Sequence, residues 1–241
     1  MNAASPPTPS IDLYWLPLGA GGHSVRLNGR IFEALAAGLQ RRERCDLYHS
    51  ALEVRVRDRR FIIEQAPSRG NDGFDRGVVA EGAVGARAAG RFRLFRYEIR
   101  RWRDGVIPDI AEAVDSPHRL SLDADVAQRL LDLVPQVPTP VWGRDELGAG
   151  EMWNSNSVVS WLIARCGLDA TSIKPPHEGR APGWRAGVVV AGRDYPQGRV
   201  APLPVEVRYR LRRHHDDFDR IIRSPKSSCA EAGKAGIGGG R

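Results

Sequence analysis

Two adjacent β-strand patterns restrict the fold more than any other feature of this sequence. Apolar and charged residues alternate along residues 51–56, which is typical of a strand with one buried face. Residues 61–66 follow after a short turn around Asp58 and are apolar at nearly every position, as expected for an inner strand. The pair predicts a sheet in which neighbouring strands run antiparallel.

Patterns elsewhere predict the remaining elements. Further strands are predicted over residues 11–18, 91–99 and 186–191. Helices are predicted over residues 31–39, after an N-cap at Ser121 and after an N-cap at Asn154. Residues 67–82 contain many glycine and aspartate residues and are predicted to form a loop. The predicted fold class is therefore α+β, with an antiparallel sheet packed against helices.

The composition divides the chain into three parts. Residues 1–10 are rich in proline and serine, and we expect them to form a disordered arm. Residues 11–193 have the length and apolar content of a single domain. Residues 194–241 form a basic extension with a glycine-rich end, which we expect to be partly disordered.

Composition also limits the class of protein. No run approaches eighteen apolar residues, so no transmembrane segment is expected. The N-terminus lacks the basic and apolar regions of a secretory signal, which favours a cytoplasmic location. Cys45, Cys166 and Cys229 are too scattered for a disulfide framework or a zinc site. We expect reduced thiols, with Cys166 buried as a small apolar residue, and neither a metal nor another cofactor.

The formal net charge of +7 raises the question of an anionic partner. Only three of the basic residues are lysines, Lys174, Lys226 and Lys234. The arginines are spread over predicted strands and turns among acidic residues, and GC-rich coding explains such a bias. Nucleic acid is therefore not favoured as a partner, and the sequence gives no oligomeric state.

A polar cluster before the last predicted helix is a candidate site. Asn154 caps this helix and places Ser155 in its first turn. Unpaired backbone N–H groups and the helix dipole favour negative charge there, so a catalytic nucleophile can work at this position. The alternative is that residues 154–157 only cap a core helix.

Two residues about a hundred positions earlier have complementary chemistry. His49 stands at the start of the first strand of the pair, and Glu64 lies within the apolar second strand. A buried carboxylate needs a partner. That partner is either a histidine, which the carboxylate would orient, or one of the many arginines.

These three segments resemble the circularly permuted branch of the NlpC-type papain-like fold. The branch includes the YiiX-like hydrolases, the PPPDE thiol peptidases and the lecithin–retinol acyltransferase group. In these families the histidine strand comes first and a nucleophilic cysteine opens a later helix, often within Asn-Cys-Asn. His49 matches the histidine, residues 63–67 resemble the Ile-Glu-Ala-x-Pro motif, and residues 154–157 resemble the nucleophile motif. The resemblance covers residues 45–165 and implies a permuted papain-like fold.

Serine stands where these families have cysteine, which changes the chemistry. The resemblance implies a hydrolase or acyltransferase in which Ser155 attacks an amide, ester or thioester carbonyl. His49 would then be the general base and Glu64 would orient it. A hydroxyl is much harder to ionise than a thiol, so close contact between serine and histidine is required.

Two other functions remain open. One is a non-catalytic relative that binds a peptide, a lipid-like ligand or another small molecule. Its groove would have Trp153 and Trp161 as its floor and arginines at its rim, with Asn154 and Asn156 as further binding residues. The other is an unrelated basic α/β protein that binds nucleic acid.

Overall fold

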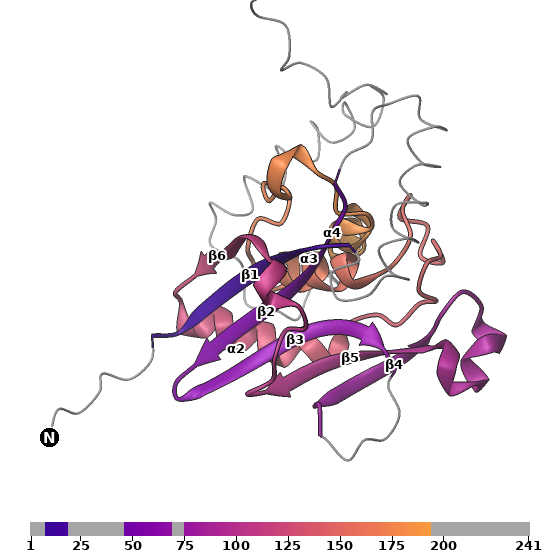
Figure 1. The fold of residues 1–241 in the computed structure, drawn as a ribbon, viewed down its shortest axis with the longest axis horizontal. Helices are drawn as coiled ribbons and strands as arrows, with labels where there is room; N and C mark the ends of the chain where they lie inside the picture. The colour runs from indigo at the N-terminus through magenta and orange to yellow at the C-terminus, as the bar shows by residue number, and fades with distance from the viewer. Residues whose placement is uncertain (1–7, 19–45, 69–74, 194–241) are drawn as a thin grey trace, which may run out of the picture.

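The computed structural model describes residues 8–18, 46–68 and 75–193. This part of the chain forms a six-stranded antiparallel sheet in the order β4-β5-β3-β2-β1-β6 (Figure 1). The strands are β1 (Ser10–Pro17), β2 (Tyr48–Val56), β3 (Arg59–Pro67), β4 (Val78–Ala83), β5 (Arg96–Arg103) and β6 (Val114–Ser121). The predicted α+β class with an antiparallel sheet is confirmed.

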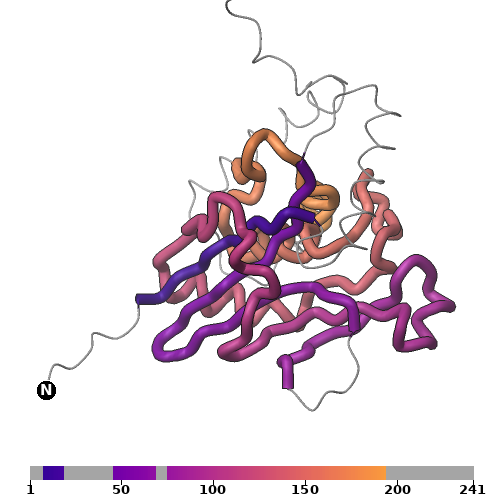
Figure 2. Tube along the Cα trace, viewed as in Figure 1, coloured from indigo at the N-terminus to yellow at the C-terminus, as the bar shows by residue number. Residues whose placement is uncertain are grey.

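Three α-helices pack against one face of this sheet, and the trace in Figure 2 shows them gathered on that side. They are α2 (Ala124–Leu133), α3 (Ser155–Arg165) and α4 (Trp184–Arg193). Short 3-10 segments lie in the connections: η1 (Arg87–Arg91), η2 (Arg93–Phe95), η3 (Ile110–Glu112), η4 (Val134–Gln136) and η5 (Pro176–Glu178). None of the described helices is long and apolar enough to cross a membrane.

The two faces of the sheet bury different sets of side chains. We call the side covered by the helices the helix face; it carries Leu13, Leu52 and Ile63 within the main core. The opposite side, called here the outer face, carries a smaller apolar cluster that includes Leu16 and Ile62. Successive side chains of a strand point to opposite faces, so these residues fix the direction of their neighbours.

The helix starts follow the chemistry of N-caps. Asn154 caps α3 as predicted, and its first turn contains a capping box with Ser157. The cap of α2 is Asp123 rather than the predicted Ser121, because the Asp123 carboxylate accepts from the backbone N–H groups of Asp125 and Val126. The Ser121 hydroxyl instead accepts from the backbone N–H of Asp123.

The prediction of a strand over residues 186–191 is wrong, because these residues lie in α4. Valine favours strands, but tertiary packing decides here. Gly187 lies so close to α3 that a Cβ atom would come within 2.1 Å of the Ser157 carbonyl oxygen. The two helices therefore cross in close contact, which Gly187 permits.

The strand predicted over residues 91–99 starts later than expected. Residues 87–95 form η1 and η2, and β5 begins only at Arg96. Arginine and apolar residues alternate before Arg96, but Phe92, Leu94 and Phe95 are exposed, so the alternation does not mark a buried face.

Two strands were not predicted. Strand β4 lies in the segment predicted as a loop, where Gly82 leaves room for the Tyr97 ring of β5. Strand β6 is an edge strand of largely exposed residues, so it has no burial pattern to detect. The helix predicted over residues 31–39 lies outside the described residues. So do most of the predicted arm and all of the C-terminal extension, which stay predictions.

Candidate functional site

The candidate site begins at the cap of α3. The Asn154 side-chain oxygen accepts from the backbone N–H groups of Asn156 at 2.9 Å and Ser157 at 3.4 Å. Its side-chain nitrogen donates to the Pro182 carbonyl oxygen at 2.8 Å. Asn154 therefore satisfies the start of the helix and also joins it to the segment before α4.

Asn156 joins the same helix to the sheet. Its side-chain nitrogen donates to the carbonyl oxygens of Tyr48 and Pro182, each at 2.9 Å. Its side-chain oxygen accepts from the Ser50 hydroxyl at 2.8 Å. This buried side chain uses both of its amide atoms to hold together β2, α3 and the segment before α4.

Two serines on the same helix bind the start of α4. The Ser157 hydroxyl donates to the Gly183 carbonyl oxygen at 2.7 Å and accepts from the Asn154 backbone N–H at 3.1 Å. The Ser160 hydroxyl donates to the Trp184 carbonyl oxygen at 2.7 Å. Asn154 and Ser157 therefore form the cap of α3, and Asn156 joins this helix to β2 and to the segment before α4.

Ser155 differs from its neighbours. It is the first residue of α3, and only 7% of its surface is exposed. Its hydroxyl makes no hydrogen bond within the described part of the chain, and its oxygen is not among the fully buried polar atoms that lack a partner. Ser155, the predicted nucleophile, therefore lies at the start of α3, is largely buried, and has no hydrogen bond from its hydroxyl to the described residues.

His49 does not face Ser155. Its neighbours Tyr48 and Ser50 point to the helix face, where Tyr48 belongs to the main core and Ser50 binds α3. His49 also lies directly opposite Leu16, a residue of the outer face. The strand therefore directs the His49 ring to the outer face. Burial lowers the pKa of His49 to about 4, against a smaller opposing effect of Asp109.

Glu64 also lies on the outer face, two residues after Ile62 of the outer-face cluster. Its carboxylate accepts from the Arg100 guanidinium at 2.9 Å, and both side chains are buried. Arg100 donates to the Glu98 carboxylate as well, at 2.8 Å. Of the two partners that the sequence left open for Glu64, an arginine is therefore present.

The three predicted catalytic residues are not brought together. Ser155 starts a helix that packs on the helix face, whereas the side chains of His49 and Glu64 project from the other side of the sheet. The predicted contact between serine and histidine is thus not made, because the strand alternation separates them.

The two predicted groove tryptophans are core residues. Trp153 and Trp161 are both buried in the main core, and their indole N–H groups have no hydrogen-bond partner in the described structure. The Arg165 guanidinium lies 5.5 Å from the centre of the Trp161 ring. Neither ring forms the floor of an open groove.

Gln65 is a site residue that the sequence reasoning missed. It points to the helix face, because Ile63 of the same strand does so. Leu52 of β2 lies directly opposite Ile63 of β3. Because the two strands are antiparallel, Ser50, two residues before Leu52, and Gln65, two residues after Ile63, lie towards the same end of the sheet on this face. Gln65 is 5% exposed, and neither of its amide atoms has a hydrogen-bond partner within the described residues. The alternation along β3 was the signal that could have revealed it.

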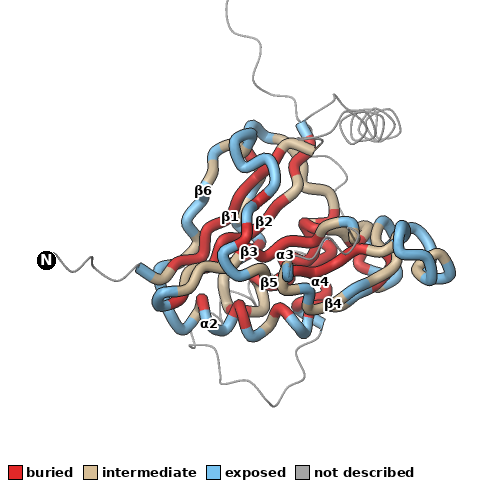
Figure 3. The backbone as a smooth tube through the Cα atoms, turned by 60° about the horizontal axis from the view of Figure 1, so that its bottom comes forward, coloured by how far each residue is buried: buried red, intermediate tan, exposed pale blue. Residues whose placement is uncertain are grey.

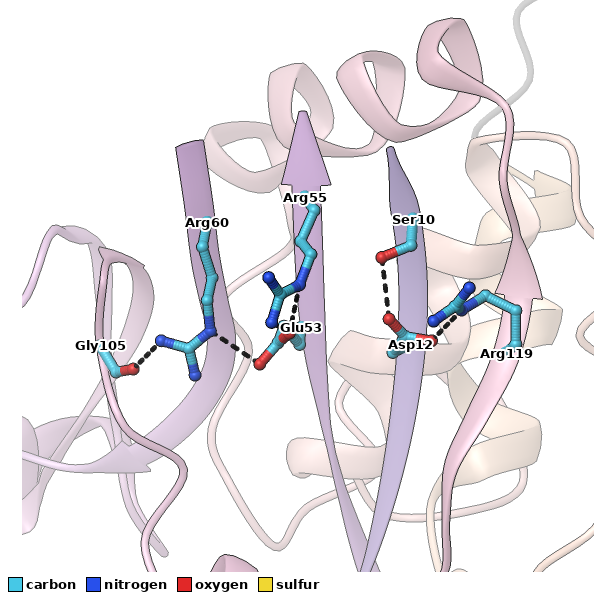
Figure 4. Close-up of polar contacts among 7 residues, drawn as sticks. All are labelled: Ser10, Asp12, Glu53, Arg55, Arg60, Gly105 and Arg119. Atoms are coloured by element: carbon cyan, nitrogen blue, oxygen red, sulfur yellow. Dashed lines mark hydrogen bonds and ion pairs between the residues drawn. The ribbon is translucent and has the colours of Figure 1, made fainter. Parts of the chain in front are cut away.

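The outer face is crossed by a network of ion pairs (Figure 4). Asp12 and Glu53 are buried and lie directly opposite each other on β1 and β2, where two carboxylates repel. Arg119 binds Asp12, while Arg55 and Arg60 each donate to Glu53 at 2.8 Å. These carboxylates are neutralised by arginine, which indicates a structural role.

Other candidate sites do not coincide with the predicted one. A shallow cavity of about 470 Å³ is lined by Gly85, Ala86, Arg87, Val141, Arg144, Asp145 and Glu146, none of them a predicted site residue. The described residues contain no group of histidine, cysteine or acidic residues that could hold a metal ion. Cys166 is buried as predicted, and its burial raises the thiol pKa to about 12.

Comparisons of this chain with protein-family models, with curated proteins and with solved structures find no match.

Proposed function

We propose that this chain is a non-catalytic domain of the permuted papain-like type that binds a peptide or lipid-like ligand at the start of α3. The direction of His49 carries this proposal, because a serine nucleophile needs a base in contact and β2 turns the His49 ring to the outer face. Support for the fold type comes from the order of elements, in which a histidine strand precedes a helix opened by Asn-Ser-Asn.

The polar groups left without partners define the ligand chemistry. Gln65 offers one amide donor and one amide acceptor, and Ser155 offers a hydroxyl. The two Gln65 amide atoms are fully buried, and buried polar groups are costly unless a partner satisfies them. A secondary amide, with its own N–H and C=O groups, complements Gln65, so the proposed ligand is a peptide or an amide-linked acyl chain.

Gln65→Leu separates binding from folding. Leucine has a similar size and removes two unpaired polar atoms, so we expect the free energy of unfolding to stay equal or rise by about 1 kcal/mol. Binding of a panel of N-acylated dipeptide amides, followed by ligand-detected NMR, should be lost. Gln128→Leu is the matched control, because Gln128 is an exposed residue of α2.

Two results would contradict the proposal. If Gln65→Leu destabilised the fold by more than about 2 kcal/mol, the amide would have a structural partner. If the wild-type protein bound no member of the panel, or Gln65→Leu bound as well as wild type, the site would not be an amide-binding site.

Acyl transfer by Ser155 remains a second candidate function, and the unpaired hydroxyl at the start of an eleven-residue helix favours it. It requires a general base other than His49. Labelling by a fluorophosphonate that is lost in Ser155→Ala would support it, and labelling that survives the substitution would exclude Ser155 as the nucleophile. Reaction of Ser155→Cys with iodoacetamide at mildly acidic pH would show that the helix start still lowers a thiol pKa.

A further inference from the structure

The connection between β4 and β5 projects beyond the sheet. It contains η1 and η2, and the ribbon in Figure 1 shows it extending past the ends of both strands. Figure 3 shows this end of the molecule largely in the colour of exposed residues. Three large apolar side chains are exposed in it: Phe92 by 54%, Leu94 by 84% and Phe95 by 45%. We call residues 84–97 the tip.

The charge of the tip has a single sign. Four arginines lie between Val84 and Tyr97, and the segment contains no aspartate or glutamate. Arg87 is paired with Glu146 and Arg96 with Glu81, both carboxylates from outside the tip. Arg91 and Arg93 flank the exposed apolar side chains in sequence, and the Arg91 guanidinium lies 4.7 Å from the centre of the Phe92 ring.

Hydrogen bonds to backbone carbonyl oxygens hold the tip in this shape. The Val84 N–H donates to the Phe95 carbonyl oxygen at 2.8 Å, which closes the base of the segment. The Phe95 N–H donates to the Phe92 carbonyl oxygen at 3.0 Å, and the Arg96 side chain donates to the Gly90 carbonyl oxygen at 2.6 Å. The apolar side chains are therefore presented by a formed structure.

We propose that the tip docks on an anionic membrane surface. Phe92, Leu94 and Phe95 would enter the boundary between head groups and acyl chains, while Arg91 contacts anionic head groups. Charge complementarity supports this partner. Leu94 favours a membrane over nucleic acid, because this side chain is the most exposed of the three and has no aromatic face on which a base could stack.

The docking surface is independent of the proposed ligand site. It uses none of the residues at the start of α3, so Gln65→Leu should bind membranes as wild type does. Failure of one proposal therefore leaves the other standing.

Co-sedimentation of the full chain with vesicles tests the proposal. Vesicles of phosphatidylcholine with phosphatidylglycerol should bind the protein, and vesicles of phosphatidylcholine alone should bind it much more weakly. Leu94→Asp should lower the partition coefficient at least tenfold. Leu122→Asp is the matched control, because Leu122 is 56% exposed but lies between β6 and α2, and this variant should bind as wild type does.

The arginine contribution is tested in the same assay. Arg91→Ala should weaken binding about fivefold, the factor that corresponds to about 1 kcal/mol per arginine near an anionic surface. Arg103→Ala, in an exposed position on β5, should have no effect. The proposal would be overturned by three results: no binding to anionic vesicles, equal binding by Leu94→Asp, or salt-dependent binding to DNA or RNA in place of vesicles.

Discussion

Replacing Asn156 by alanine tests whether the polar cluster at the start of α3 is structural. The Asn156 side chain takes part in three hydrogen bonds, with Ser50, Tyr48 and Pro182. Alanine keeps the helix but removes all three bonds. The neighbouring residue Ser155 offers a matched comparison, because its hydroxyl has no partner in the described structure.

The expected cost follows from these bonds. A hydrogen bond contributes about 0.5–1.5 kcal/mol to stability, and a buried group left without a partner costs about 1–3 kcal/mol. The Pro182 carbonyl oxygen keeps its bond from Asn154, whereas the Ser50 hydroxyl loses its acceptor. We therefore expect Asn156→Ala to lower the free energy of unfolding by about 2–4 kcal/mol and Ser155→Ala by less than about 0.5 kcal/mol.

Urea unfolding, followed by tryptophan fluorescence, measures both variants. With a slope of about 2 kcal/mol per molar urea, the midpoint should fall by about 1–2 M for Asn156→Ala and hardly move for Ser155→Ala. Equal midpoints for the two variants would contradict this prediction. The three hydrogen bonds of Asn156 would then contribute no more stability than the Ser155 hydroxyl does.

Two further predictions concern the outer face. The pKa of His49 in the folded protein is about 4, below its ordinary value of 6.5, so the unfolded chain takes up the proton first and stability falls as the pH drops from about 6.5 to about 4. The free energy of unfolding, measured from urea midpoints, should fall between pH 7 and pH 4.5 by about 2 kcal/mol less in His49→Gln than in wild type. An equal fall in both proteins would contradict the lowered pKa of His49. Arg100→Met should cost about 3–5 kcal/mol because it removes the buried guanidinium that binds both the Glu64 and the Glu98 carboxylate, whereas the exposed Arg103→Ala should cost less than about 0.5 kcal/mol. A similar loss in both arginine variants would count against the buried triad.

Features encoded by local chemistry were predictable from the sequence. The alternation in β2 reflects one buried face, and the hairpin to β3 follows from the turn between them. Asn154 identified the start of α3, because a cap depends on bonds to residues only two and three positions away.

Features decided by distant contacts were not predictable in the same way. Residues 186–191 have the composition of a strand, and only the close approach of Gly187 to α3 shows why they form a helix. Strand β6 has no apolar pattern, because it pairs with β1 at the exposed edge of the sheet. In both cases the deciding partner lies far away in the sequence.

The separation of His49 from Ser155 is encoded in the alternation of β2. The alternation that buries Leu52 on the helix face places His49, an odd number of residues away, on the other face. On β3, Gln65 lies two residues after Ile63 and shares the helix face with it, whereas Glu64 lies one residue after Ile63 and projects from the outer face. A motif resemblance compares the order of residue types, whereas the face of a strand depends on the parity of each position.

The polar residues at the start of α3 have structural roles that do not depend on any reaction. Asn154, Asn156 and Ser157 hold α3 to β2 and to the start of α4, so they are required by the fold whether or not the site reacts. Ser155 alone among the four residues is not needed for these contacts. Packing alone therefore accounts for three of these four residues, and any chemistry of this helix start depends on the one hydroxyl that packing does not use.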